Sequence, residues 1–287
     1  MSPLAVLLVV VAAFAHAGWN LSAKRAGTGG SVFVWLYAVL SVVLLVPAAV
    51  VDVLVSGARP QWSWLLALGV SGLLHVGYFV LLQRGYAVGD MSVVYPLARG
   101  TGPLLSVLFA VAVLDERPGA VALAGAFVVV AGVFVIGGAT DAAGTGNRAA
   151  GVGYGVVTGI TIAGYTLWDA HAVTTLAVPP LVQLGGGVVV EAAALTPVAL
   201  AKRREIGALW RGHRRDAAVV AVLSPLAYVL VLYAMRLAPV ALVAPARELS
   251  IVIGSVIAWR VLHEPKPGRR LAGAAIVLAG VFALAVG

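Results

Sequence analysis

Long apolar runs, separated by short polar or Gly- and Pro-rich gaps, make up nearly all of the 287-residue chain. A bilayer core about 30 Å thick needs roughly 20 mostly apolar residues per helix, so the gaps divide the chain into candidate membrane spans. The pattern predicts an all-α integral membrane protein with ten transmembrane helices. The predicted spans are 4–23, 32–54, 64–83, 91–114, 120–138, 152–172, 178–200, 217–235, 239–262 and 270–286.

Composition excludes most other classes of protein. The chain is 62% hydrophobic and 10% charged, with a mean hydropathy of +1.05, which is far from the balance of a water-soluble domain. The net charge of +8 lies mostly in the gaps between apolar runs, which indicates lipid headgroups and not a nucleic-acid partner. Cysteine is absent, so no disulfide or thiolate metal site is expected, and we expect no cofactor.

The second half of the chain repeats the first. A shift of 148 positions brings 114–134 onto 262–282, and a shift of 146 aligns 17–26 with 163–172. Apolar bias alone produces scattered Ala and Val matches, not glutamates and glycines matched at fixed places, so an internal repeat is indicated. The identities include Leu114/Leu262, Glu116/Glu264, Leu123/Leu271, Ala124/Ala272, Gly125/Gly273, Gly132/Gly280 and Phe134/Phe282.

Five spans per repeat make the second copy enter the membrane from the opposite side, which predicts two inverted five-helix repeats, a transporter architecture. Each copy ends with an apolar helix, a Glu-containing turn and a Gly-rich helix, VAVLDERPGAVALAGAFVVVAGVFV and WRVLHEPKPGRRLAGAAIVLAGVFA. These stretches, with HAGWN and YPLAR, resemble the EamA domains of the drug/metabolite transporter superfamily. We predict one repeat at 1–139, a connector at 140–150 and the second repeat at 151–287.

The resemblance implies a central cavity that opens alternately to each side of the membrane. The leading expectation is a secondary transporter of small metabolites, such as amino acids or related zwitterionic and anionic compounds, and proton coupling is one option for its energy source. Alternatives are an exporter of cationic drugs or choline-like compounds, a passive channel and a lipid flippase. Enzyme activity is not expected, because P-loop, H-E-x-x-H and G-x-S-x-G motifs are missing. A monomer suffices to enclose a site, and a dimer stays open.

Basic residues in the gaps predict the orientation. Lys and Arg gather after the first, third, fifth, seventh and ninth spans, whereas the other gaps hold only Arg59, Arg117 and Arg236. The positive-inside rule then places the first set of gaps in the cytoplasm and both termini outside the cytoplasmic (inner) membrane.

Two arginines lie inside predicted spans at matching repeat positions, Arg99 and Arg247. A charge at a helix centre costs about 2.5–3.5 kcal/mol on insertion scales, so each requires a function or a partner. Tyr95 shares a helix face with Arg99. One interpretation is that both guanidinium groups bind a carboxylate or phosphate of the substrate. The alternative is that they form ion pairs with Glu248 and Glu191.

A polar stripe on the first span suggests further cavity residues. His16, Trp19 and Asn20 fall on one helix face and align with Ile162, Tyr165 and Thr166 of the second repeat. A histidine side chain ordinarily titrates near neutrality, so His16 is a candidate for proton coupling, although packing explains a lone histidine as well.

Other polar residues inside the spans are assigned in three groups. Glu191 and Glu248 are candidate proton carriers, and Tyr78 and Tyr228 are candidate substrate contacts, with His75 a weaker candidate beside Tyr78. The aromatic and polar group Trp168, Asp169 and His171 is attributed to the membrane surface. The family resemblance implies that Glu116 and Glu264 cap the helices that follow them or mark the ends of an interface.

Overall fold

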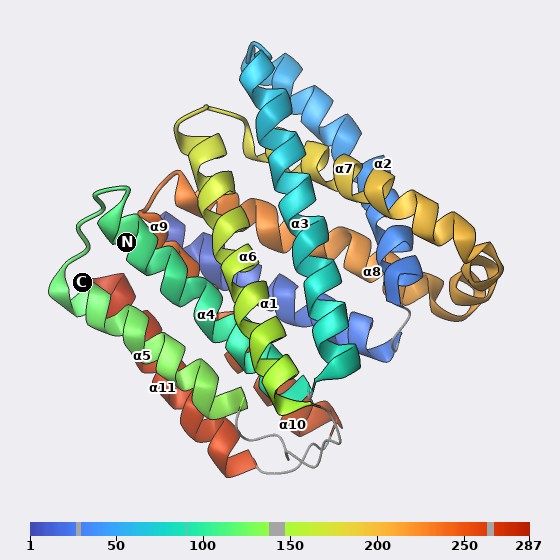
Figure 1. Ribbon diagram of the computed structural model, residues 1–287. Helices are drawn as coiled ribbons and strands as arrows, with labels where there is room; N and C mark the ends of the chain where they lie inside the picture. The colour runs from blue at the N-terminus through green and yellow to red at the C-terminus, as the bar shows by residue number, and fades with distance from the viewer. Residues whose placement is uncertain (27–29, 90, 138–146, 263–266) are drawn as a thin grey trace.

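The computed structural model describes residues 1–26, 30–89, 91–137, 147–262 and 267–287. Its elements are all helices (Figure 1). They are α1 (Pro3–Arg25), α2 (Gly30–Ser56), α3 (Trp62–Val88), α4 (Met91–Ala112), α5 (Ala120–Gly137), α6 (Arg148–Thr174), α7 (Pro180–Ala201), α8 (Arg203–Met235), α9 (Val240–Ala246), α10 (Leu249–Leu262) and α11 (Pro267–Val286). The predicted all-helical fold is confirmed.

Seven of the helices are long and apolar enough to cross a membrane, namely α1–α4 and α6–α8, and α5 and α11 are shorter apolar helices. Large apolar side chains such as Leu54, Val55 and Phe282 are exposed on the outer faces of the bundle. Water does not tolerate such a surface, whereas lipid does. The chain is therefore a multi-pass membrane protein.

The two halves pack with the same pattern of neighbours. α1 contacts α8 as α6 contacts α3, and α1 contacts α10 as α6 contacts α4. α2 packs against α7, and α5 packs against α11, so each of these helices meets its own repeat counterpart. The Met1 ammonium group donates to the Ala285 carbonyl at 3.3 Å, and Figure 1 marks both chain ends on one side of the molecule. The repeat read from the sequence is thus a repeat in space.

Glycines allow α5 and α11 to touch along their backbones. A Cβ atom on Gly280 would lie 2.7 Å from both the Gly125 carbonyl oxygen and the Val129 nitrogen, and one on Gly132 would lie 2.8 Å from the Val277 nitrogen. Backbone atoms cannot relieve such a clash by changing rotamer, as a side chain can. These glycines, which match between the repeats in the sequence, therefore let the last helices of the two repeats pack closely together.

Two predicted boundaries are wrong. The span predicted at 239–262 is interrupted at Arg247 and Glu248, where the amides of Glu248 and Ser250 bond to carbonyls only three residues back. Pro245 lacks an amide hydrogen, which weakens the regular helix just before the interruption. The gap predicted before 217 is also helical: α8 starts at Arg203 and is kinked at His213.

We predict that Gly280→Ala destabilises the protein by about 1–3 kcal/mol, because the added methyl group forces the α5 and α11 backbones apart. Thermal unfolding of the detergent-purified protein measures the change. Gly153→Ala on α6 is the matched control, since a Cβ there meets nothing within 4 Å. Equal melting temperatures for the two variants would contradict the proposed role of the glycines.

Candidate functional site

A cavity of about 160 Å³ lies in the middle of the bundle. At about 30 Å³ per water molecule, this is the space of roughly five waters, which suits a small metabolite. Both repeats contribute to its wall, through α1–α4 and α6–α8 and through Arg247 at the end of α9. Its polar and aromatic lining comprises His16, Trp19, Tyr37, Ser41, Ser71, His75, Tyr78, Phe79, Arg99, Tyr165, Glu191, Ser224, Tyr228 and Arg247.

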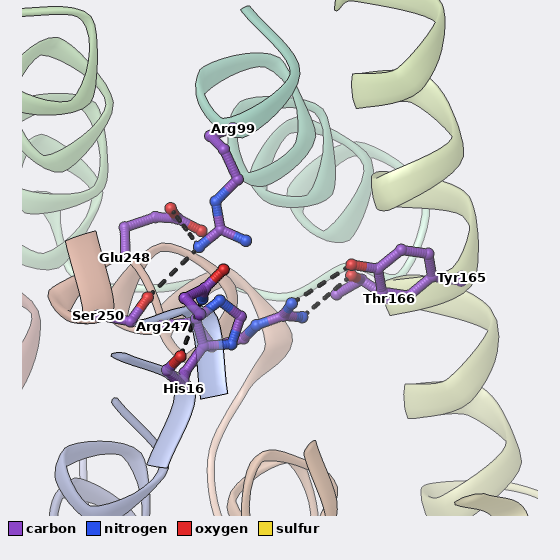
Figure 2. A network of polar contacts seen from close by, with 8 residues as sticks. His16, Arg99, Tyr165, Thr166, Arg247, Glu248 and Ser250 are labelled. Atoms are coloured by element: carbon purple, nitrogen blue, oxygen red, sulfur yellow. Dashed lines mark hydrogen bonds and ion pairs between the residues drawn. The ribbon is translucent and has the colours of Figure 1, made fainter. Parts of the chain in front are cut away.

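Arg99 forms an ion pair with an acid from the other repeat. Its Nη2 atom lies 2.8 Å from Oε2 of Glu248 and 3.4 Å from the Ser250 hydroxyl, as Figure 2 shows. Both partners of the ion pair are nearly fully buried. The two side chains form an ion pair without a well-aligned hydrogen bond, because Glu248 Oε2 accepts no hydrogen bond from the described residues. Most of the Arg99 charge is therefore neutralised within the protein.

Arg247 is held differently. Its Nη1 donates to the Thr166 hydroxyl at 3.3 Å and its Nη2 to the Tyr165 hydroxyl at 3.5 Å, and Figure 2 shows the side chain reaching toward α6. Its guanidinium carbon lies 5.5 Å from the centre of the Tyr228 ring, in the range of a cation–π contact. Among the described residues no carboxylate lies within ion-pair distance of it. The cavity therefore contains a cation without an acidic partner.

Four rings gather beside this cation. His75 stacks on Tyr165 with ring centres 4.3 Å apart, and its ring centre lies 5.4 Å from that of Tyr228. The Tyr165 ring also meets Tyr78 and Tyr228 edge to face, at 5.8 and 6.0 Å. The rings interlock α3, α6 and α8, so the wall around Arg247 is preorganised and presents hydroxyl groups along with apolar faces.

The model of the EamA-like transporter family matches residues 3–138 and 149–286 of the sequence. The chain belongs to the EamA-like transporter family. This confirms the resemblance carried by the repeat motifs and makes the protein a membrane transporter of the drug/metabolite type.

A solved structure titled "Crystal structure of protein" shares the fold of this EamA-like transporter. It aligns with 98% of this chain and 96% of its own chain, at 20% sequence identity and a TM-score of 0.74. At that identity the likeness shows the fold alone. A comparison with curated proteins finds no match.

Most residues predicted to bind substrate in this EamA-like transporter line the cavity. They are His16, Trp19, Tyr78, Arg99, Tyr165, Tyr228 and Arg247, and the predicted proton carrier Glu191 lines it too. Asn20, Tyr95 and Glu248 do not. The Asn20 amide instead donates to the His16 carbonyl at 2.8 Å, and Glu248 faces Arg99. The functional roles of all these residues stay predictions.

The contribution of α2 to the cavity was not predicted. Tyr37 and Ser41 of α2 line the cavity, and Ser41 donates to the Ala221 carbonyl of α8 at 3.0 Å. A tyrosine and a serine four residues apart in an otherwise apolar span are a helix-face signal that could have been recognised. Ser71 and Ser224 gave no such signal, because single serines are common on packed helix faces.

Asp169 is not at a membrane surface, contrary to its assignment. Its side chain is 1% exposed and accepts hydrogen bonds from Gln183 and from the cavity residue Tyr228. Trp168 also points inward and donates to the Ala67 carbonyl of α3 at 2.9 Å. The attribution was wrong because α7 and α8 cover the end of α6, which hydropathy along one helix does not reveal.

Glu116 caps a helix of the other repeat. Its two carboxylate oxygens accept the Val240 and Ala241 amides, each at 2.9 Å, at the start of α9. Of the two expectations for Glu116, the cap on the helix after it is therefore wrong, whereas the contact with α9 lies at an interface between the repeats; Glu264 lies outside the described residues. The cap fixes the short helix that precedes Arg247 and so helps to position this cation.

We predict that Arg99→Gln destabilises the protein by about 3–5 kcal/mol, because Glu248 is then buried without a cation. Replacing both partners, Arg99→Met with Glu248→Leu, should restore most of the stability. Chemical unfolding of the single and double variants gives the coupling energy. If the double variant loses as much free energy of unfolding as the two single variants together, loss of the ion pair does not explain the destabilisation.

Proposed function

We propose that this protein is an alternating-access secondary transporter that moves small anionic or zwitterionic metabolites, amino acids foremost, across the cytoplasmic membrane. The observation that carries the proposal is the position of Arg247, a cation on the wall of a central cavity that no acid of the described residues neutralises. A guanidinium group offers paired, planar donors that match a carboxylate or a phosphate. Binding such a group would give the buried charge the partner it lacks.

The geometry around Arg247 supports a ligand with both charged and apolar parts. The two protein hydrogen bonds of its guanidinium group are long, at 3.3 and 3.5 Å, so a carboxylate that approaches from the cavity competes well with them. Tyr165 and Tyr228 provide hydroxyl groups and ring faces on either side. The cavity volume of about 160 Å³ favours a metabolite of amino-acid size.

The architecture supports alternating access. Interrupted helices whose ends meet at the membrane midplane, at the boundary between repeats, are a recurrent design of secondary transporters. α9 and α10 together form one interrupted crossing of the membrane, with Arg247 at the break. When they are taken as one crossing, the two inverted repeats have ten crossings in total. Both termini then lie on one side, and the basic gaps on the other side orient the termini away from the cytoplasm.

A cationic substrate is the second candidate. Glu191 lines the cavity, and the rings of His75, Tyr78, Tyr165 and Tyr228 could surround an ammonium group. Arg247 opposes this candidate, since a cation in the same cavity would be repelled by it. The two candidates therefore make opposite predictions for the loss of Arg247.

We predict that anionic or zwitterionic metabolites raise the melting temperature of the purified protein and that Arg247→Gln abolishes the rise. A ligand at 100 times its dissociation constant stabilises the folded state by about 2.7 kcal/mol, which a thermal-shift screen of amino acids, organic acids, sugar phosphates and choline-like cations detects. Arg236→Gln is the control, because Arg236 is exposed at the end of α8.

The screen also discriminates the second candidate. If only cations stabilise the protein, and Arg247→Gln strengthens their effect, the anion proposal is wrong and Glu191 becomes the principal binding group. Counterflow of the stabilising compound in proteoliposomes then tests for a carrier, because a passive channel shows no counterflow.

A further inference from the structure

Asp169 is a buried carboxylate that neutral donors hold. Its Oδ1 accepts the Gln183 amide at 2.9 Å, and its Oδ2 accepts the Tyr228 hydroxyl at 2.6 Å. No Lys, Arg or His of the described residues lies within ion-pair distance of it. An ionised carboxylate inside a helix bundle with only neutral donors is costly, and protonation removes that cost.

Tyr228 lies between Asp169 and Arg247. Its hydroxyl donates to the carboxylate, while Arg247 lies 5.5 Å from the centre of its ring. Asp169 and Arg247 are thus separated by one side chain, which also lines the cavity. A change of charge on Asp169 therefore alters the electrostatic field at Arg247, the proposed substrate-binding cation, from which Tyr228 alone separates it.

We propose that Asp169 is a proton-binding site of the transport cycle and that its protonation strengthens the binding of an anion at Arg247. This inference rests on the proposed transporter function for its physiological meaning, but the proton site itself can be tested without a substrate.

Besides Asp169 and Tyr228, the proton transfer needs only a hydronium ion that enters the cavity. When Asp169 is ionised, the Tyr228 hydroxyl donates to Oδ2. The hydronium ion passes a proton to the Tyr228 oxygen and leaves as water, while that oxygen passes its own proton to Oδ2, so one proton enters and tyrosine stays neutral. Protonated Asp169 then donates to the Tyr228 oxygen, and the tyrosine O–H bond turns toward the cavity, where it becomes a donor for the substrate.

Protonation also changes the field at Arg247. With Asp169 ionised, its negative charge partly offsets the cation across the tyrosine ring. With Asp169 neutral, Arg247 attracts an anion more strongly. By linkage, the bound anion favours the protonated carboxyl to the same extent, so proton and anion bind together and move in the same direction.

Other titratable groups face this region and must be separated from Asp169. They come from each neighbouring helix: His16 from α1, His75 from α3, Arg99 with its partner Glu248 near α4, Tyr165 from α6 itself, Glu191 from α7 and Tyr228 from α8. Gln183 of α7 contacts Asp169 directly but does not titrate, and its Oε1 is buried without a hydrogen bond. His16, His75 and Glu191 are the rival proton carriers in the cavity.

We predict that an infrared titration of the lipid-reconstituted protein, from mildly acidic to mildly alkaline pH, shows a protonated-carboxyl band that disappears in Asp169→Asn. Asparagine keeps both contacts, since its oxygen accepts from Gln183 and its amide donates to Tyr228. Asp115→Asn is the matched control, because Asp115 is exposed beside Arg117 and asparagine tolerates its positive φ. With only 11 Asp and Glu residues in the chain, one carboxyl is a resolvable part of the signal.

Two more variants make the assignment specific. Glu191→Gln should keep the titrating band, and Tyr228→Phe should keep it to more alkaline pH, because the ionised carboxylate loses a donor. A band that survives Asp169→Asn and vanishes in Glu191→Gln would assign the proton to Glu191 and overturn the proposal. So would a wild-type spectrum without any titrating carboxyl.

The linkage to the anion is a separate measurement. For whichever anion stabilises the wild type in the thermal-shift screen, its dissociation constant should fall as pH falls, and Asp169→Asn should bind it tightly at every pH. If the infrared result holds and no anion binds, the proton site stands and the proposed substrate class fails. If anions bind with the same pH dependence in Asp169→Asn, the coupling fails instead.

Discussion

The interior of a membrane-spanning bundle offers no water to a charge, so each ionised side chain there needs a partner from the protein or from a ligand. Arg99 and Glu248 satisfy one another across the two repeats. Arg247 and Asp169 do not meet, and each is held only by neutral donors, hydroxyl groups or a ring face. Arg247 and Tyr228, which lies between these two charges, both line the cavity.

The interruption of the ninth crossing follows from the same constraint. Arg247 lies at the carboxyl end of α9, and Glu248 precedes the amino end of α10, so both charges face the helix ends that favour them. At the other end of α9, Glu116 of the first repeat accepts two free amides. The short helix is therefore held by charges at both ends, and one of these belongs to the opposite repeat. Relative movement of the repeats has to act on this helix, and with it on Arg247.

Much of this was predictable from hydropathy and self-similarity, since most spans, the repeat and the two arginines all leave a signal along the chain. The interruption at Arg247 left only a weak signal, namely Pro245 and the dipeptide Arg247–Glu248, because the window from 239 to 262 is otherwise mostly apolar. Which acid pairs with which arginine is decided by helix packing between repeats, which no single-helix pattern contains. Asp169 illustrates the limit best: it lies one turn from the end of α6, where the sequence indicates a headgroup contact, yet α7 and α8 cover it fully.

The difference between the two arginines has a simple origin in the broken symmetry of the repeats. Glu248 follows Arg247 directly, but its counterpart after Arg99 is Gly100, where a Cβ atom would collide with Phe134. The two symmetric cations thus have one such acid between them. Since neighbouring residues point about 100° apart around a helix, Glu248 turns away from Arg247 and reaches Arg99. Asp169 likewise has only Ala23 as its counterpart. The acids of this nearly symmetric scaffold are therefore placed asymmetrically, and among the described residues Arg247 has no acid, and Asp169 no base, within ion-pair distance.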